Sequence, residues 1–223
     1  MLSVSPERRP LPRRGAMAIG KLPAGCGAAL MAFACTAAPV DNTSTTVPQD
    51  VRALIAPTDT LLAYKAADLY GDGSWAAVVV VRHPATEMSD LDFDHNPCDL
   101  RVLRRQNGKI VEVDHSRKAV DCTYNDLERH APAMSLNDYL TVSPGNITFV
   151  NQQRRGWSSF EFAWSKGKGT WYLHRATASN VDSENNGTQT TISYPKDLGW
   201  TPMASIDPDA TAEVLERQGK TKQ

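Results

Sequence analysis

The run DLYGDGSWAAVVVV at residues 68–81 constrains the fold more than any other part of this chain. It ends in four consecutive valines, Val78 to Val81, and an apolar run without polar alternation is typical of a strand covered on both faces. It begins with Asp68 and a Gly-Asp-Gly turn. The run therefore predicts an acidic turn that leads directly into a buried β-strand.

The rest of the chain alternates strand-sized segments with turn residues. In the clearest hairpin, at residues 100–115, alternating apolar and polar residues flank Asn107-Gly108, a strong two-residue turn signal. A second hairpin is expected at 138–152, turning at Pro144-Gly145-Asn146. Further strands are expected at 60–67, 119–124, 157–164, 170–176 and 192–194, and a short amphipathic helix at 209–218. This spacing predicts an all-β fold with one antiparallel domain at 51–210, either a β-sandwich or a β-propeller-like body of about 8–10 strands, and a C-terminal tail at 211–223.

The N-terminus has the order of a secretory signal peptide at residues 1–35. Basic residues precede the weakly apolar stretch at 22–38, which is too short and too rich in Gly and Ala for a membrane span. Cys35, preceded by Ala-Phe-Ala, resembles the Cys of a bacterial lipobox and predicts a lipid anchor; ordinary cleavage near Ala38 is the alternative. Residues 36–50 are small and polar and predict a flexible tether. We therefore expect the mature protein in the periplasm, with the anchor holding it on the outer membrane.

The charge of the mature body argues against nucleic acid as a partner. Five of the 24 Lys and Arg residues and one of the 25 Asp and Glu residues lie at positions 1–35. The remainder has 19 basic and 24 acidic residues, a net charge of −5, whereas nucleic-acid binding needs a basic face. Hydrophobic and charged contents of 41% and 22% are typical of a globular domain.

Export also determines how the cysteines are interpreted. Cys26 and Cys35 belong to the targeting segment, which leaves Cys98 and Cys122 in the mature body. An isolated pair of cysteines in an oxidising compartment predicts a disulfide. A redox or metal site would need a C-x-x-C motif or added histidines, and the sequence has neither.

The sequence contains no recognisable catalytic motif. It lacks H-E-x-x-H, G-x-S-x-G and a phosphate-binding glycine loop, and its five histidines show no metal-ligand spacing. We therefore expect surface histidines and no enzyme activity. Asp90, Asp92, Asp94 and Asn96 lie at alternate positions of a long loop, so they predict either a solvated acidic loop or additional ligands for a cation.

The segment QQRRGWSSFEF at residues 152–162 is the best candidate for a partner-binding site. Arg154, Arg155 and Trp157 surround Gly156 at an expected turn between two strands, and Arg and Trp are the residue types that most often anchor interfaces. An exposed Arg-Arg-Trp loop fits an acidic cleft. The alternative is a solvated hairpin end with Trp157 folded onto the body.

The acidic turn resembles the FG-GAP or integrin-α type of calcium loop, D-x-[DN]-x-D-G-x-x-D followed by a strand. Asp68, Asp72 and Gly73 match this pattern, whereas Tyr70 and Ala76 stand where the family has ligand side chains. The resemblance implies a Ca²⁺ site at Asp68, Tyr70, Asp72 and Ser74. The alternative is that the loop is a tight turn without metal.

The lipoprotein-like N-terminus, the acidic turn, the hairpin at 100–115, Cys122 and the later segments RRGWSSFEFAW, GTWYLHRA and ISYPKDLGW together resemble bacterial envelope immunity lipoproteins of the type IV secretion X-Tfi type. These are similar to the periplasmic inhibitor of invertebrate-type lysozyme. The resemblance implies a calcium-binding β-body that blocks a secreted lysozyme-like, peptidoglycan-degrading toxin. The alternative function is a non-catalytic calcium-binding structural or adhesion-type envelope module.

Overall fold

The computed structural model describes residues 46–84, 95–122, 131–181, 184 and 187–220. The chain divides into two units, residues 1–36 and 37–223, and every described element belongs to the second unit. The expected signal peptide and its lipidation site Cys35 lie outside the described residues. Within the described part, no helix has the length and apolar character needed to cross a bilayer.

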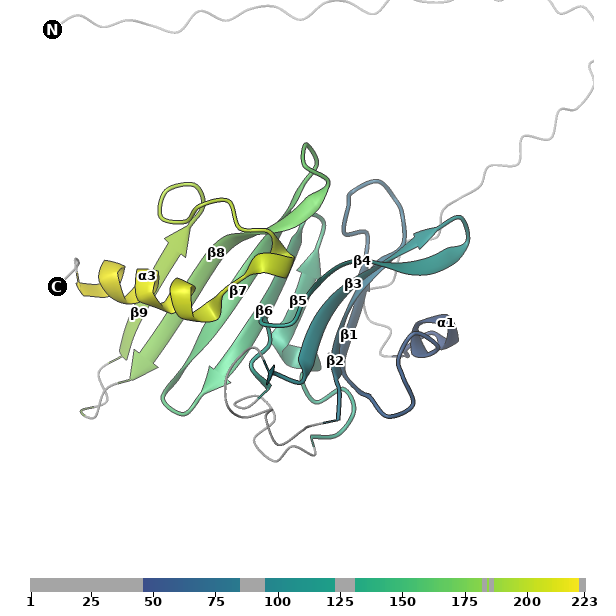
Figure 1. Ribbon diagram of the computed structural model, residues 1–223, viewed down its shortest axis with the longest axis horizontal. Helices are drawn as coiled ribbons and strands as arrows, with labels where there is room; N and C mark the ends of the chain where they lie inside the picture. Colours follow the sequence, from purple (N-terminus) through teal and green to yellow (C-terminus); the bar gives the residue numbers. More distant parts are fainter. Residues whose placement is uncertain (1–45, 85–94, 123–130, 182–183, 185–186, 221–223) are drawn as a thin grey trace, which may run out of the picture. The chain divides into compact units, whose positions relative to one another are not determined.

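The described strands form two antiparallel sheets (Figure 1). The first sheet contains β1 (Thr60–Ala67), β2 (Ala76–Arg82), β3 (Cys98–Gln106) and β4 (Lys109–Ser116). The second contains β5 (Leu140–Ser143), β6 (Asn146–Gln153), β7 (Gly156–Ser165), β8 (Thr170–Val181) and β9 (Gly187–Ser193). In both sheets, strands that follow one another in the chain are neighbours. The all-β prediction is confirmed in its sandwich-like form, because the described strands make two open meanders and do not close into a propeller.

The valine strand β2 is buried on both faces, as its sequence predicts. Val78 and Val80 belong to the main hydrophobic core, whereas Val79 and Val81 belong to a second cluster on the opposite face. The helix α1 (Gln49–Arg52) contributes Val51 to this second cluster, and Val47 also packs there. The packed body therefore includes residue 47, slightly before its expected start near Val51.

The main core lies between the two sheets. It joins Leu62, Val80 and Leu100 of the first sheet to side chains of the second, of which Trp171, Phe149 and Phe162 are the largest fully buried ones. Large apolar side chains removed from water on both sheets provide the main driving force for this packing.

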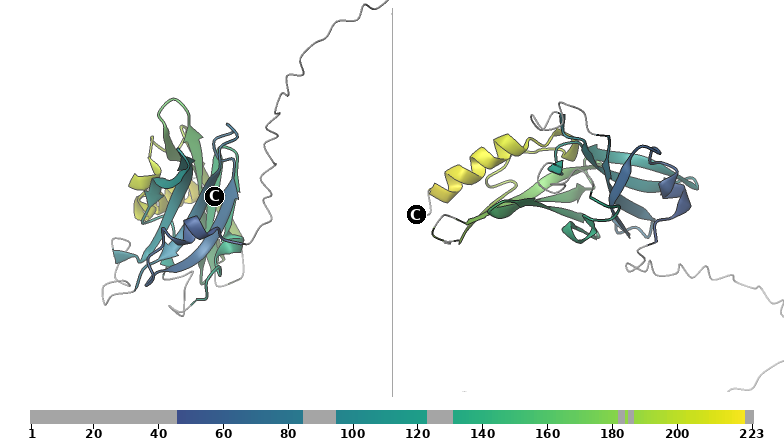
Figure 2. Two further views of the ribbon diagram at one scale, coloured as in Figure 1. Left: turned by 90° about the vertical axis from the view of Figure 1, so that its right-hand side faces the viewer. Right: turned by 90° about the horizontal axis from the view of Figure 1, so that it is seen from below.

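The helix predicted at 209–218 is present as α3 (Pro208–Lys220). Figure 2 shows it lying along one face of the second sheet. Val214 and Leu215 pack against the main core. Residues 211–220 are therefore part of the packed body instead of the expected tail, because adjacent apolar side chains of α3 meet the sheet.

The turns follow the sequence closely, and one strand prediction is wrong. Asn107 and Gly108 both have positive φ, 50° and 77°, as a type I′ hairpin turn requires.

The strand predicted at 119–124 is not formed in its described part, 119–122. Instead, the Asn151 side chain accepts a hydrogen bond from the Asp121 N–H and donates one to the Ala119 carbonyl. Short 3₁₀ turns, η2 (Asn137–Tyr139) and η3 (Met203–Ser205), complete the described elements.

Candidate functional site

The acidic loop at Asp68 is a hydrogen-bonded turn. One carboxylate oxygen of Asp68 accepts the Asp72 N–H at 3.1 Å, and the other accepts the Gly73 N–H at 2.9 Å. Asp72 in turn accepts the Ser74 N–H at 3.0 Å and pairs with Arg104 of β3. Hydrogen bonds from Ser74, and further the charge of Arg104, lower the pKa of Asp72. The carboxylates that would bind a cation thus already bind N–H groups and a guanidinium.

Tyr70 connects this loop to the second sheet. Its ring meets Trp164 edge-on with centroids 4.6 Å apart, and its hydroxyl accepts the Trp171 indole N–H at 3.5 Å. The Arg104 guanidinium lies 4.1 Å from the centroid of the same ring. The Leu69 carbonyl accepts the Gly145 N–H at 2.8 Å, which adds a backbone link between the sheets. The loop thus fastens the two sheets together, and this packing explains a Tyr at a position where the resembled family has a ligand.

The geometry of the loop fits a structural turn better than an open ligand set. Among the residues that the structure describes, no group of three or more His, Cys, Asp and Glu side chains is arranged to hold a metal ion. Asp90, Asp92 and Asp94 lie outside those residues. Calcium binding at Asp68, Tyr70, Asp72 and Ser74 therefore stays a prediction.

The second candidate site is the turn between β6 and β7. Arg154 and Arg155 are exposed at this turn, and within the described residues neither guanidinium forms a hydrogen bond or an ion pair. The arginines inside strands differ, because each has a polar partner for its guanidinium: Arg82, Arg101, Arg104, Arg105 and Arg175. The turn therefore presents two cations that the fold itself does not use.

The turn is held firmly against β8. The Arg155 carbonyl accepts the Val181 N–H at 2.8 Å. Gly156 has φ 151°, and a β-carbon on it would lie 1.8 Å from the Ser179 carbonyl oxygen. Glycine is thus required at 156, and the close contact fixes the direction in which the two arginines leave the sheet.

Trp157 lies on the sheet face that points away from the main core. Phe160 and Phe162 of β7 are buried in that core, and side chains alternate between faces along a strand. In register, Trp157 is opposite Gln152 on one side and Ser179 on the other, and Ser179 is opposite Gln189 of β9. Trp157 is half-buried in this otherwise polar row, so it lies beside the arginine turn without entering the core.

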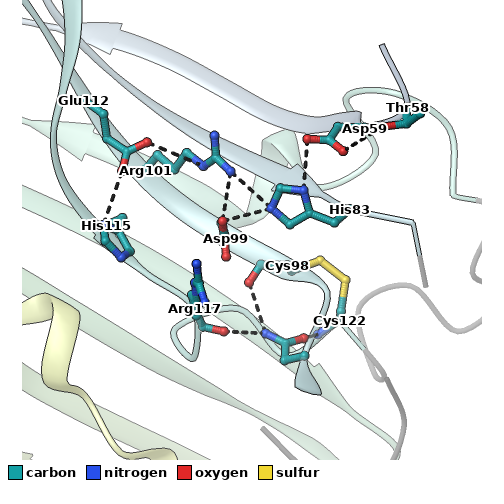
Figure 3. Close-up of polar contacts among 11 residues, drawn as sticks. Thr58, Asp59, His83, Cys98, Asp99, Arg101, Glu112, His115, Arg117 and Cys122 are labelled. Carbon is teal, nitrogen blue, oxygen red and sulfur yellow. Dashed lines mark hydrogen bonds and ion pairs between the residues drawn. A yellow bond between two sulfur atoms is a disulfide. The ribbon is translucent and has the colours of Figure 1, made fainter. Parts of the chain in front are cut away.

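A third cluster, which the sequence does not predict, surrounds His83 just after β2 (Figure 3). One ring nitrogen of His83 lies 2.9 Å from Asp59, and the other lies 2.9 Å from Asp99. Arg101 also donates to Asp99 at 2.9 Å. The same guanidinium nitrogen of Arg101 lies 3.1 Å from the His83 ring nitrogen that faces Asp99, so His83, Asp99 and Arg101 form one polar cluster. Burial acts to raise the pKa of Asp99, but hydrogen bonds and charges from His83 and Arg101 outweigh burial and lower this pKa.

The His83 cluster links the ends of three neighbouring strands, β1, β2 and β3. In the first sheet Thr60 is opposite Arg82, and Arg82 is opposite Cys98. Their chain neighbours Asp59, His83 and Asp99 therefore come together. Thr58 donates to Asp59 and not to His83, so the described contacts contain no nucleophile paired with a base. The His83 side chain is 36% exposed, so it lies at the surface as expected, but its contacts with Asp59 and Asp99 were not predicted. The sequence could have revealed this cluster only through the register between β2 and β3, and that register depends on where β3 begins.

The expected disulfide joins Cys98 to Cys122, with Cα atoms 5.6 Å apart. Asn96 supports it: its amide nitrogen contacts the carbonyls of Cys98, Arg117 and Val120, and its oxygen accepts the Cys122 N–H at 3.2 Å. Asn96 is thus used to organise the backbone around the disulfide.

Comparisons of the chain with protein-family models, with curated proteins and with solved structures found no match.

Proposed function

We propose that this chain is a non-catalytic binding protein of the bacterial envelope that inhibits a lysozyme-like, peptidoglycan-degrading enzyme. The observation that supports this proposal is the rigid, exposed Arg154–Arg155 turn, whose guanidiniums have no partner among the described residues. A pair of unused cations on a turn with a fixed backbone is suited to an acidic partner surface, because binding breaks no existing ion pair and needs no ordering of the turn backbone.

In this proposal the inhibitor blocks the enzyme without performing chemistry. Arg154 and Arg155 pair with carboxylates in the cleft of the enzyme, since guanidinium groups bind carboxylates in a bidentate geometry. Trp157 lies beside them with its ring partly exposed and fills an adjoining apolar subsite. A signal peptide with a lipid anchor at Cys35 would place the inhibitor in the periplasm, where a secreted muramidase attacks the cell wall.

The proposal is tested by measuring cell-wall lysis. Purified Ala37–Gln223 is added to a panel of muramidases, including invertebrate-type lysozyme, and the loss of turbidity of a cell-wall suspension is recorded. We expect stoichiometric inhibition of at least one enzyme, and weaker inhibition at higher salt because the contact is ionic.

Paired variants localise the effect. The double substitution Arg154→Ala/Arg155→Ala should weaken inhibition by about 100-fold or more, as expected for the loss of two charged contacts at an interface. The control Arg117→Ala/Lys166→Ala removes two exposed positive charges elsewhere and should leave inhibition unchanged. Equal inhibition by both variants would refute the assignment of the turn, and no effect of the wild-type protein on any muramidase would refute the proposed function.

A further inference from the structure

The four sheet edges of the described body are protected to very different degrees. An exposed edge strand presents unpaired N–H and C=O groups, and proteins commonly protect it with a cover, charges, a bulge or a short length. The β1 edge is covered, because the Leu61 and Leu62 carbonyls accept the N–H groups of Met134 and Leu136. The β4 edge carries Lys109, Glu112, Asp114 and His115, and its register shift makes Val113 a bulge. The β5 edge has only four residues.

Among the residues that the structure describes, none of these protections is found at the fourth edge, β9. It reads GTQTTIS, without a charged residue or a proline, and it pairs with β8 over its whole length without a register shift. It is the terminal strand of the second sheet. α3 lies on one face of this sheet (Figure 2), where Gly219 approaches the Thr190 side chain.

The backbone groups of β9 that point outward follow from one hydrogen bond. The Tyr194 N–H donates to the His174 carbonyl of β8 at 2.9 Å. Because these groups alternate sides along an antiparallel strand, residues 188, 190 and 192 also point toward β8. Gly187, Gln189 and Thr191 therefore point their N–H and C=O groups away from the sheet. Ser193 also points outward, but its N–H and C=O are bonded to Asp197.

We propose that the β9 edge is a homodimer interface at which β9 pairs antiparallel with β9 of a second copy. A two-fold axis at Gln189 places Gln189 opposite Gln189 of the second copy and Gly187 opposite Thr191. The outward N–H and C=O groups of Gly187, Gln189 and Thr191 then face the same groups of the second copy. The three facing pairs form two hydrogen bonds each, about six in all. Thr188 faces Thr190, a favourable cross-strand pair, and no like charges meet within the paired strands.

This pairing has a consequence for the Arg154–Arg155 turn, in combination with the proposed function. The row of Gln152, Trp157, Ser179 and Gln189 continues across the axis into the second copy. The two Trp157 side chains then lie on the same face of a ten-stranded sheet, five strand spacings or about 24 Å apart. The dimer thus presents two copies of the candidate site on one surface.

A cysteine substitution tests both the dimer and its register. Opposite residues of a hydrogen-bonded pair have Cα atoms about 5.5 Å apart, which is within disulfide range. In Ala37–Gln223, Gln189→Cys should therefore give a disulfide-linked dimer on a non-reducing gel. Thr191→Cys, on the same face of the same strand, should not cross-link to itself but should cross-link when mixed with Gly187→Cys. Equal cross-linking of Gln189→Cys and Thr191→Cys would overturn the proposed register.

The uncross-linked protein provides the second measurement. Light scattering after size-exclusion chromatography should give twice the monomer mass at micromolar concentration. Gln189→Pro removes an outward N–H while leaving the ladder to β8 intact, and it should weaken dimerisation about 10-fold or more with an unchanged circular dichroism spectrum. Gln189→Ala keeps the backbone donors and should remain dimeric. A monomeric wild-type protein would overturn the proposal, whether or not the chain inhibits a muramidase.

Discussion

Gly156 lies so close to Ser179 that a β-carbon on Gly156 would be 1.8 Å from the Ser179 carbonyl oxygen. This contact joins the turn that carries Arg154 and Arg155 to the neighbouring strand β8. It makes the presentation of the two arginines depend on a residue with no side chain.

Substitution Gly156→Ala should therefore destabilise the protein. The added methyl group must displace the β8 backbone, and the positive φ of 151° is also unfavourable for alanine. We expect a loss of about 2–4 kcal/mol in the free energy of unfolding, measured by urea denaturation. Gly167→Ala is the matched control, because nothing lies within 4 Å of a β-carbon there. Equal stability of the two variants would contradict the close approach.

The Asp99 carboxylate should make the stability sensitive to acid. Its pKa is lowered in the folded state, so its contribution is complete above the unfolded-state pKa near 3.8 and is lost as the pH falls through the lower, folded pKa. Asp99→Asn should cost about 1–3 kcal/mol at neutral pH and make the acid limb of the stability curve less steep. Denaturant titrations between neutral pH and the acid limb measure both effects. A variant with an unaltered acid limb would show that Asp99 does not contribute to it.

The acidic loop should contribute to stability even without metal. Asp68→Ala removes the acceptor of two backbone N–H groups, so we expect it to lower the free energy of unfolding by about 1–2 kcal/mol in the presence of chelator. Asp138→Ala is a suitable control, because Asp138 is an exposed acid without a described hydrogen bond or ion pair. If the two variants were equally stable, the hydrogen bonds of the turn would be energetically neutral.

A calcium titration distinguishes the two interpretations of the same loop. If the resemblance to calcium loops extends to function, Ca²⁺ should raise the Tm of the wild-type protein with saturation, and the shift should be absent in Asp68→Ala/Asp72→Ala. Mg²⁺ at the same concentration serves as the control. If Ca²⁺ left the Tm of the wild-type protein unchanged, the calcium prediction would be contradicted, and the loop would be a structural turn without metal.

The disulfide should provide a large part of the stability. Cys98 and Cys122 are 24 residues apart, and in the chain-entropy model closing such a loop contributes about 3–4 kcal/mol. The double variant Cys98→Ala/Cys122→Ala should show this loss in denaturant unfolding. If it remained as stable as the wild-type protein, the hydrogen bonds of Asn96 alone would hold the segment.

Much of the fold could be predicted because its signals are local. The valine run, the Asn107-Gly108 turn and the strand at 157–164 each depend on residues a few positions apart, and all three predictions are confirmed. The segment 119–122 was mispredicted for the opposite reason: its backbone groups are satisfied by Asn96 and Asn151, which are distant in the sequence.

The candidate sites divide in the same way. Arg154, Arg155 and Trp157 were recognised from residue type and from their place at a turn, and the structure shows both arginines exposed. The role of Tyr70 was not recognised, because it depends on Trp164 and Trp171 of the second sheet. The cluster of Asp59, His83 and Asp99 was missed because strand register brings its members together.

Local sequence was enough to establish the strand pattern, the burial of β2 on both faces and the hairpin turns, since side-chain alternation and turn preferences act over a few residues. The pairing of Cys98 and Cys122 followed from the cysteine count instead. The folded arrangement was needed to show that the acidic loop fastens two sheets, that Gly156 must lack a side chain and that β9 keeps an open edge. These features depend on register and on the packing of one sheet against the other, which the chain reaches by burying its apolar surface as a whole.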